Sequence, residues 1–331
     1  MDMLTLSKLF FLIVSVSLTP LHAYIHYEFT GKGNVNIVYT KYGDQKGQYG
    51  SIVISPGRTE SSLKHEELSN ELIEKGFSPV FIINHRGQGL SGRVLEDTNK
   101  GHVAKFSYYY KDFEKFVKSV LRDSQTDKNN LFLLAHSMGG AIATGYLQTY
   151  GTDLFKGLVL SSPMLGINFN DKTEFEVLME TLIACKTPLG PDCNDYAQEG
   201  KYSPEADLFE GNDNTSSRDR FERRKRLWMD IPKLQLGGPS IRWVKEAIKA
   251  NLKMRRHKAI KKITDLPVLL LQAEKDVTVS NEKQSKFCST VNKVDGNCTL
   301  KVIKNSKHEI LMEADHIRDI GVRHILDFIE H

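Results

Sequence analysis

The chain has 331 residues, of which 40% are hydrophobic and 26% charged, and its formal net charge is +4 at pH 7. This length suits one large α/β domain or two smaller ones, and the composition is that of an ordinary globular protein. The sequence has no internal repeat and no low-complexity run, which argues against a solenoid or a disordered chain. So small a net charge gives no reason by itself to expect nucleic-acid binding.

Residues 1–23 have the features of a secretory signal peptide. Lys8 is followed by the apolar stretch "LFFLIVSVSLTPLHA", which ends in a small residue at Ala23. This stretch is too short for a comfortable membrane span, which needs roughly 20 apolar residues. We therefore expect cleavage after Ala23 and an exported protein. An uncleaved N-terminal anchor remains the alternative, and periplasm, secretion and membrane surface all stay open as destinations.

Short apolar runs predict the strands of a sheet. After the signal segment, "IHYEFT" and "VNIVYTKY" predict an antiparallel start. The runs that follow are nearly continuous rather than alternating, which is typical of strands buried on both faces of a parallel sheet. They cover residues 51–55, 78–84, 130–136, 156–162, 266–273 and 298–304.

Helical patterns separate these runs. They cover residues 61–76, 109–123, 141–151 and 314–330. Strands that alternate with helices predict right-handed crossovers and a mostly parallel sheet with helices on both faces. We predict that this α/β core comprises residues 24–163 and 264–331.

The alternation is interrupted once, between Pro163 and Thr264. This segment has no clear strand run, and its charge is strongly polarised. Residues 164–217 contain 3 Lys and Arg against 11 Asp and Glu, whereas residues 218–262 contain 16 against 4. An insertion of this size predicts a helical cap, residues 164–263, over the carboxyl edge of the sheet.

Four cysteines fit an exported protein, because an even number behind a signal peptide indicates disulfides. Their spacing favours Cys185–Cys193 and Cys288–Cys298, although three pairings are possible. Neither C-x₂-C nor H-x₃-H spacing lies near them, so we expect no zinc site.

The stretch "LLAHSMGG", residues 133–140, carries the first chemical signal. A buried strand ends at His136, Ser137 follows, and a helix starts at about Met138. In such a turn the residues two before and two after the serine must be small, and here they are Ala135 and Gly139. This is the nucleophile elbow, with Ala at the first Gly position, and it predicts Ser137 as a nucleophile.

A serine nucleophile needs a base, and the base needs a carboxylate, in the chain order Ser, Asp or Glu, His. Asp276 follows the run that ends at residue 273, and we prefer it to Glu274 as the carboxylate. His308 lies in a polar loop before the last helix and is the predicted base. Three later histidines are expected to be solvated or packed: His316, His324 and His331.

Two further positions belong to this prediction. His136 neighbours the serine, but the elbow turns it the other way, so we interpret it as structural. An oxyanion needs backbone N–H donors in a dry pocket. We expect these from Met138, which follows the serine, and from Arg58, in the loop "SPGRTE" after the first parallel strand.

Together, "AHSMGG", "NHRGQGLSGR", Asp276 and "KHEILME" resemble the monoacylglycerol-lipase-like branch of the α/β-hydrolases, often labelled serine aminopeptidase-type. Within that branch the sequence is similar to bacterial lysophospholipases. "SPGRTESSLKHEEL" from residue 55, "KGHVAKFSYYYKDF" from residue 100 and "GGPSIRWVKEAIKA" from residue 237 carry this second likeness. The resemblance runs from about Tyr39 to Phe328 and implies an α/β-hydrolase fold.

The resemblance also implies a reaction. Ser137 would attack a carboxylic ester and form an acyl-enzyme, His308 would move the proton, and Asp276 would orient His308. No metal or organic cofactor is implied. Fold alone does not settle the substrate, so a monoacylglycerol lipase or general esterase, a serine aminopeptidase and a lipid-binding protein with a dead site remain alternatives to a lysophospholipase.

The basic half of the cap is the one physical hint about substrate. Arg242 and Trp243 lie in it, and we expect them at a phospholipid headgroup. The same half suits a peripheral contact with an anionic membrane surface, although a solvated helix face explains it equally well. We expect no nucleic-acid partner.

Overall fold

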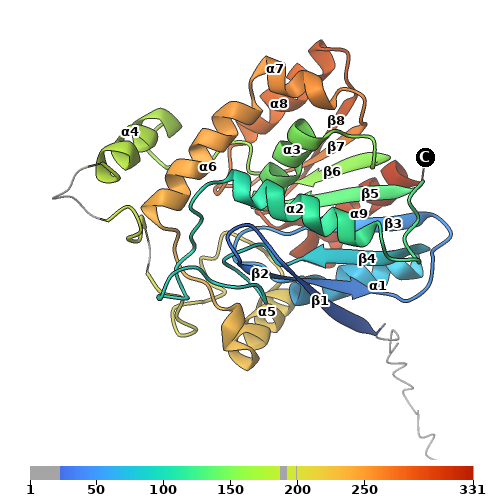
Figure 1. Ribbon diagram of the computed structural model, residues 1–331, viewed down its shortest axis with the longest axis horizontal. Helices are drawn as coiled ribbons and strands as arrows, with labels where there is room; N and C mark the ends of the chain where they lie inside the picture. The colour runs from blue at the N-terminus through green and yellow to red at the C-terminus, as the bar shows by residue number, and fades with distance from the viewer. Residues whose placement is uncertain (1–22, 187–191, 199, 331) are drawn as a thin grey trace, which may run out of the picture.

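The computed structural model describes residues 23–186, 192–198 and 200–330 (Figure 1). The predicted signal peptide therefore lies outside the described residues, except for Ala23. Within the described part of the chain, no helix combines the length and the apolar character that crossing a bilayer requires.

An eight-stranded sheet forms the centre of the molecule, in the order β1-β2-β4-β3-β5-β6-β7-β8. The pairs β1–β2 and β2–β4 are antiparallel and all others are parallel. The strands are β1 (Tyr24–Thr30), β2 (Asn36–Tyr42), β3 (Gly50–Ser55), β4 (Phe77–Ile83), β5 (Leu131–His136), β6 (Gly157–Ser161), β7 (Val268–Ala273) and β8 (Cys298–Ile303). The predicted fold class is confirmed, and the antiparallel start lies where the sequence indicated it.

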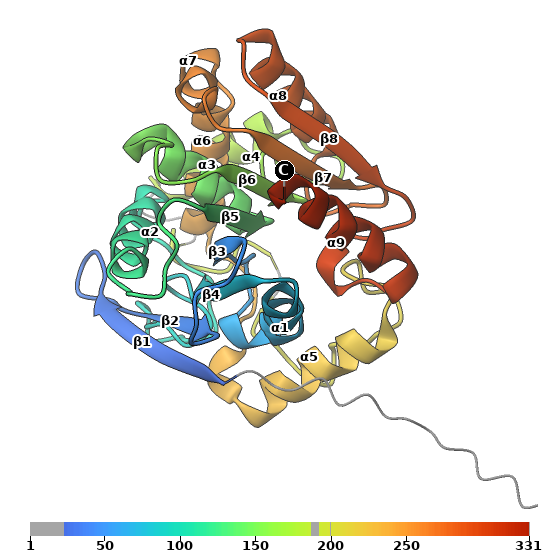
Figure 2. The same ribbon diagram turned by 90° about the vertical axis from the view of Figure 1, so that its right-hand side faces the viewer.

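Helices cover both faces of the sheet (Figure 2). The helices α1 (Glu66–Glu74) and α9 (Asp315–Ile329) pack on one face. The other face is covered by α2 (Ser107–Val120), α3 (Met138–Tyr150) and α8 (Asn281–Lys293). Because each face buries its own apolar cluster, strands such as β3 and β5 are buried along their whole length. This burial explains why their sequences are continuously apolar rather than alternating.

The segment between β6 and β7 contains α4 (Glu174–Ala184), α5 (Arg218–Asp230), α6 (Ile241–Met254) and α7 (His257–Ile260), and no strand of the sheet among its described residues. α6 packs on α3 and α4 and contributes Trp243 to the same apolar cluster as α2 and α3. α5 instead crosses to the other side of the molecule and lies beside α1 (Figure 2). The insertion thus reaches both sides of the sheet rather than its carboxyl edge alone.

Short 3₁₀ helices complete the description: η1 (Ser62–His65), η2 (Pro232–Leu234), η3 (Lys261–Ile263) and η4 (Ile310–Met312). Two disulfides form, with the pairing that the spacing favours. Cys185–Cys193 lies at the end of α4, and Cys288–Cys298 joins α8 to β8. All four cysteines are therefore paired.

Candidate active site

Ser137 occupies a strained turn between β5 and α3. Its backbone has φ 50° and ψ −120°, a conformation that a residue with a side chain rarely adopts. A Cβ atom at Gly139 would lie 2.0 Å from the backbone oxygen of Ser55 on the neighbouring strand. The turn therefore requires glycine at position 139, and the small residue at Ala135 pairs with Ser55 in the sheet. This is the elbow geometry that the sequence predicts.

A chain of hydrogen bonds joins Ser137 to His308 and Asp276. The Ser137 Oγ and the His308 Nε2 are 2.8 Å apart, and the His308 Nδ1 is 2.8 Å from Asp276 Oδ2. The second carboxylate oxygen of Asp276 accepts from the backbone N–H groups of Thr278 and Val279, at 2.9 and 3.0 Å. A carboxylate at Nδ1 fixes the tautomer that leaves Nε2 free to accept the serine proton.

The competing residues lie elsewhere. Glu274 accepts from the Lys304 ammonium at 2.6 Å and from the Asn305 backbone N–H at 2.9 Å, on an exposed turn. His316 is exposed on α9 and His324 is half-buried on the same helix. His331 lies outside the described residues. Of the candidates weighed from the sequence, the structure brings together Ser137, Asp276 and His308.

The two predicted oxyanion donors lie on the same cavity as Ser137. Met138 is the first residue of α3, so its backbone N–H has no acceptor within the helix. Arg58 follows Pro56 and Gly57 at the end of β3. Its guanidinium donates to the Gly237 carbonyl and lies over the Trp243 ring, 5.6 Å from the ring centre.

Sequence reasoning missed a set of buried charged residues behind this site. Glu60 and Lys64 come from the chain after β3, and Glu309 follows His308. Their side chains are joined to each other and to His136 by hydrogen bonds. The only sequence signal was the glutamate of "PGRTE", which spacing alone does not connect to residues more than 70 positions away.

The cavity over Ser137 has a volume of about 1180 Å³. One wall comes from the start of the insertion, α4 and α6, and it carries an apolar group beside charged side chains such as Lys172 and Glu180. The apolar group, here called the apolar wall, includes Met164, Ile167, Phe169, Val177, Trp243 and Val244. A second, mostly polar wall comes from residues 198, 200–203, 206–208 and 210–214 and from α5. Of the two expected headgroup residues, Trp243 lines this cavity. Arg242 is not among its described lining residues, and its Nε donates to Asn194 at 3.1 Å.

Charges on the cavity wall are mostly paired. Six carboxylates and four cationic side chains line it. Four of the carboxylates pair with cations, in Glu180–Lys172, Asp207–Arg224, Glu210–Arg218 and Glu309–Lys64. Among the described residues, no group of three or more His, Cys, Asp and Glu side chains is arranged to hold a metal ion.

Comparison with known proteins places the chain among characterised relatives. The family described as "Serine aminopeptidase, S33" matches residues 47–315. Lysophospholipase L2 of Escherichia coli (strain K12) is 35% identical over 307 residues, which cover 91% of this chain and 86% of that protein. The probable lysophospholipase L2 of Haemophilus influenzae is 33% identical over 303 residues, covering 91% and 90%.

A solved structure shares the fold. A soluble variant of monoglyceride lipase from Saccharomyces cerevisiae, in complex with a substrate analogue, superposes with a TM-score of 0.70 at 18% identity and covers 95% of both chains. The elements that carry Ser137, Asp276 and His308 thus belong to a fold seen in other enzymes.

Proposed function

Since the chain belongs to the serine aminopeptidase S33 family and is a carboxylic-ester hydrolase, we propose that it is a lysophospholipase that releases a fatty acid through an acyl-enzyme on Ser137. One observation carries this proposal: the hydrogen-bonded chain Ser137–His308–Asp276 opens into a large cavity with an apolar wall. The names of the bacterial relatives point to the same substrate class.

The proposed reaction has two halves. Ser137 Oγ attacks the ester carbonyl while His308 Nε2 takes its proton, and the N–H groups of Arg58 and Met138 hold the oxyanion. The oxyanion collapses, the C–O bond to the glycerol breaks, and His308 gives its proton to the departing alkoxide. Water then attacks the acyl-enzyme, with His308 again as base, and the fatty acid and free Ser137 are released.

Residues 164–263 act as the cap in this proposal and orient the substrate. The fatty acyl chain lies against the apolar wall of α4 and α6, where Trp243 contributes its ring. The headgroup then lies toward the polar wall of residues 198–214. The placement follows from polarity, because an acyl chain buried against charged side chains would lose its hydrophobic stabilisation and desolvate them.

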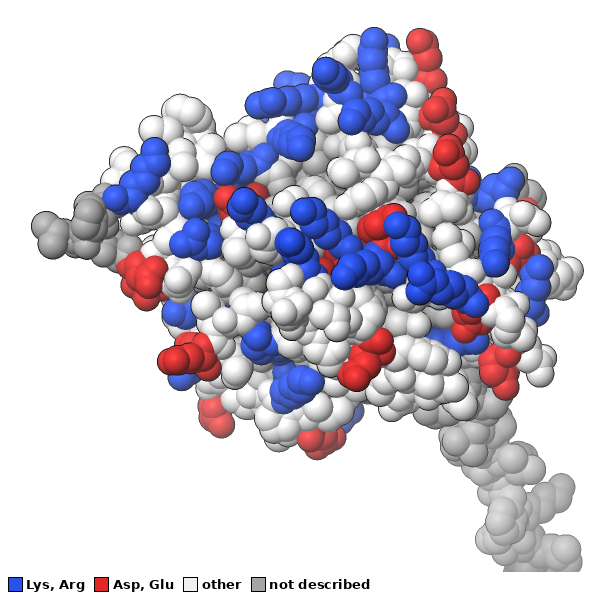
Figure 3. Space-filling view, viewed as in Figure 1, with Lys and Arg blue, Asp and Glu red and all other residues white. Residues whose placement is uncertain are grey.

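We include export and membrane contact in the proposal. Two disulfides support export, since such bonds persist in oxidising compartments. For the membrane, a group of exposed cations follows α6 and α7 (Figure 3): Lys253, Arg256, Lys258, Lys261 and Lys262. Beside α6, the helix α4 exposes Phe175, Met179 and Ile183 at a spacing of four, which places them on one face. An apolar face beside cations suits an anionic bilayer surface.

The experiment that tests the function is fatty-acid release from lysophosphatidylcholine by the mature protein and by its Ser137→Ala variant. A matched control is Ser119→Ala, a partly exposed serine on α2 whose hydroxyl donates to the Lys115 carbonyl. We expect release by the wild type and the control, and none above background by Ser137→Ala. Turnover that survives in Ser137→Ala would contradict the acyl-enzyme.

Parallel substrates separate the alternatives. A monoacylglycerol that is hydrolysed faster than the lysolipid would favour a monoacylglycerol lipase. Cleavage of an amino-acid arylamide without lipid turnover would favour an aminopeptidase. Failure of Ser137 to react with a fluorophosphonate, with no turnover of any substrate, would favour a lipid-binding protein.

A further inference from the structure

Four buried charged side chains behind Ser137 form a continuous set, here called the charge tetrad: Glu60, Lys64, His136 and Glu309. The Lys64 ammonium donates to Glu60 Oε1 at 2.6 Å and to Glu309 Oε1 at 2.7 Å. Glu60 Oε2 lies 3.2 Å from His136 Nδ1 and accepts the backbone N–H of Gly57. The exposed fractions of the four side chains are 2%, 1%, 7% and 12%. Ions buried this deeply are stable only when paired.

Members of the tetrad adjoin three loops of the proposed site. His136 directly precedes the nucleophile, and Glu309 directly follows the base. Through the Gly57 N–H, Glu60 holds the loop that carries the proposed oxyanion donor Arg58. The tetrad therefore links the elbow, the oxyanion loop and the base loop, which are far apart in the sequence.

The contacts of His136 determine its protonation. Its Nδ1 faces a carboxylate oxygen of Glu60 at 3.2 Å, and its Nε2 faces the backbone oxygen of His308 at 3.4 Å. Neither oxygen has a proton to donate when Glu60 is ionised. Both ring nitrogens must then carry hydrogen, which makes His136 an imidazolium.

Charge balance leads to the same protonation state. Two carboxylates face Lys64 and His136, so the tetrad is neutral only when His136 is charged. Burial lowers the pKa of His136, but the neighbouring carboxylates Glu60 and Glu309 outweigh burial and the opposing charge of Lys64, so the pKa is raised overall. His65 also faces Glu60 Oε2, at 3.2 Å, and the ring of His308 lies 5.0 Å from the His136 ring.

We propose that His136 is a positioning residue that is an imidazolium at neutral pH and, through the charge tetrad, holds the loops of Gly57 and His308 against Ser137. This inference rests on the roles proposed above for Ser137 and His308, and it assigns the histidine of "AHSMGG" a role beyond packing. A neutral tetrad also matters for the reaction, because a net charge so near His308 would bias the protonation of the base.

The backbone geometry supports a positioning role. A Cβ atom at Gly57 would lie 2.8 Å from His136 Nδ1 and 3.1 Å from Glu60 Oε2. The oxyanion loop thus lies directly against the His136–Glu60 pair. Displacement of that pair moves the loop, and a misplacement of about 1 Å can lower a rate by about a hundredfold.

The first test needs no substrate. In the mature protein labelled with ¹⁵N-histidine, long-range ¹H–¹⁵N correlation separates an imidazolium, whose two ring nitrogens resonate together, from a neutral ring, whose nitrogens resonate far apart. We expect the imidazolium pattern for His136 at pH 7, assigned by its loss in His136→Gln. His85 is the internal control, because it is fully buried, contacts a serine hydroxyl, and has its pKa lowered by burial to about 3. A neutral pattern for His136 would overturn the proposal.

The second test is the pH profile of kcat with a short-chain nitrophenyl ester. A raised pKa means that the contribution of charged His136 is complete below its ordinary value of 6.5 and is lost as pH rises through the folded value. Glu60→Gln removes the charge that holds the proton. We expect its alkaline loss of kcat to begin at lower pH than in the wild type, with KM little changed.

Three further variants make this test specific. Glu66→Gln, an equal change six residues away, should keep the wild-type profile because Glu66 lies outside the tetrad. His136→Gln should lower kcat by about 10- to 100-fold, and adding Glu60→Gln should restore part of the loss by removing the unpaired carboxylate. An unchanged alkaline limb in Glu60→Gln would contradict the proposal. If the ester is hydrolysed but the lysolipid is not, the proposed lysophospholipase function is contradicted. The pH profile with the ester then still tests the role of the tetrad.

Discussion

At the scale of single residues, the carboxylate opposite His308 decides whether the base has the correct tautomer. Asp276→Asn keeps the shape of the side chain but removes the acceptor that holds the proton on Nδ1. We expect kcat for ester hydrolysis to fall by about 10³- to 10⁴-fold with little change in KM. Steady-state kinetics with a nitrophenyl ester measures this.

Glu274 offers a matched control two residues away. It bonds Lys304 and Asn305 rather than His308, so Glu274→Gln should leave kcat within about twofold of the wild type, as expected for an exposed site. Equal losses in the two variants would mean that Asp276 acts through the shape of its loop and not through His308.

The residues that the sequence predicted share one property. Ser137, Asp276 and His308 each lie in the turn or loop that follows a strand, and the carboxyl ends of parallel strands meet at one edge of the sheet. The members of the charge tetrad share no such position relative to the strands. Lys64 and Glu309 are 245 positions apart, and a charged residue in a helical pattern is normally solvated. Only the packed structure shows that these side chains are buried together.

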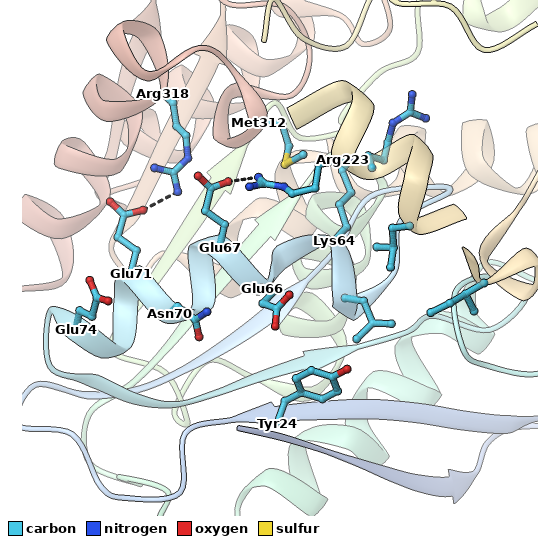
Figure 4. Close-up of a pocket in the computed structure, with 14 residues that line it drawn as sticks. Tyr24, Lys64, Glu66, Glu67, Asn70, Glu71, Glu74, Arg223, Met312 and Arg318 are labelled. Carbon is cyan, nitrogen blue, oxygen red and sulfur yellow. Dashed lines mark hydrogen bonds and ion pairs between the residues drawn. The ribbon is translucent and has the colours of Figure 1, made fainter. Parts of the chain in front are cut away.

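At the scale of elements, α5 is fastened to α1 by ion pairs (Figure 4). The Arg220 guanidinium pairs with Glu67 at 2.7 Å and with Asp315 at 2.8 Å, and it donates to the Glu313 carbonyl at 2.6 Å. Arg223 also pairs with Glu67. A cavity of about 650 Å³ lies beside these pairs. From the sequence, the basic half of the cap suited either an anionic membrane surface or a solvated helix face, whereas Arg220 and Arg223 pair with residues of the core.

We therefore expect Arg220→Ala to lower the free energy of unfolding by about 1–3 kcal/mol at pH 7, since it leaves the Glu313 carbonyl and Glu67 with fewer partners. Arg226→Ala is the control. Because the Arg226 side chain is exposed on the same helix, this substitution should change the free energy of unfolding by less than about 0.5 kcal/mol. Chemical denaturation measures both values. A loss of equal size in the control would attribute the effect to helix propensity.

The free energy of unfolding that Arg220→Ala loses depends on pH, and the pKa of Glu67 gives the direction of this dependence. Burial alone would raise the pKa of Glu67, but Arg220, Arg223 and Arg318 outweigh it and lower the pKa to about 2. Because the pKa of Glu67 is lowered, its ionised carboxylate stabilises the fold fully above pH 4.5, the ordinary pKa of the group. This stabilisation is lost as pH falls toward 2. The difference in free energy of unfolding between Arg220→Ala and the wild type should therefore shrink as pH falls from 4.5 toward 2.

The disulfide between α8 and β8 permits a second prediction at this scale. Cys288 and Cys298 are 10 positions apart, and closing so short a loop stabilises a fold by about 2–3 kcal/mol in the chain-entropy treatment. The double variant Cys288→Ala, Cys298→Ala should lose about that much stability, and thiol reductant should then have no further effect at this bridge. Thermal unfolding with and without reductant measures it. An unchanged midpoint would mean that α8 needs no covalent tie.

Between elements, the sequence was informative where burial imposes a pattern and silent where contacts are polar. The central strands β3 to β7 were predicted within about two residues because both of their faces are buried. α8 was missed, since it buries few apolar side chains, among them Phe287 and Val291, and its remaining positions are polar. The path of α5 across to α1 depends on ion pairs between positions 153 apart, which no local pattern contains.

At the scale of the whole molecule, the net charge of +4 is unevenly distributed. The arginines of α5 are largely paired, whereas the cations that follow α6 and α7 are exposed and gather on one face (Figure 3). Within the cap, we assign the proposed membrane contact to this second group, because its charges are exposed. The proposal thus depends on α6 and α7 rather than on the whole basic half of the cap.

The decisive variant reverses three of these charges: Lys253→Glu, Lys258→Glu and Lys262→Glu. Each lysine near an anionic surface contributes about 1 kcal/mol, so binding to vesicles of phosphatidylglycerol and phosphatidylcholine should weaken by about 3 kcal/mol or more, roughly a hundredfold. Lys128→Glu is the control, because that exposed residue precedes β5 and lies outside the group of cations on α6 and α7. Wild-type binding should also fall as salt shortens the screening length to about 3 Å near 1 M. Binding that resists both salt and charge reversal would leave the apolar face of α4 as the contact, and a Phe175→Ser variant would then be the one that releases the protein.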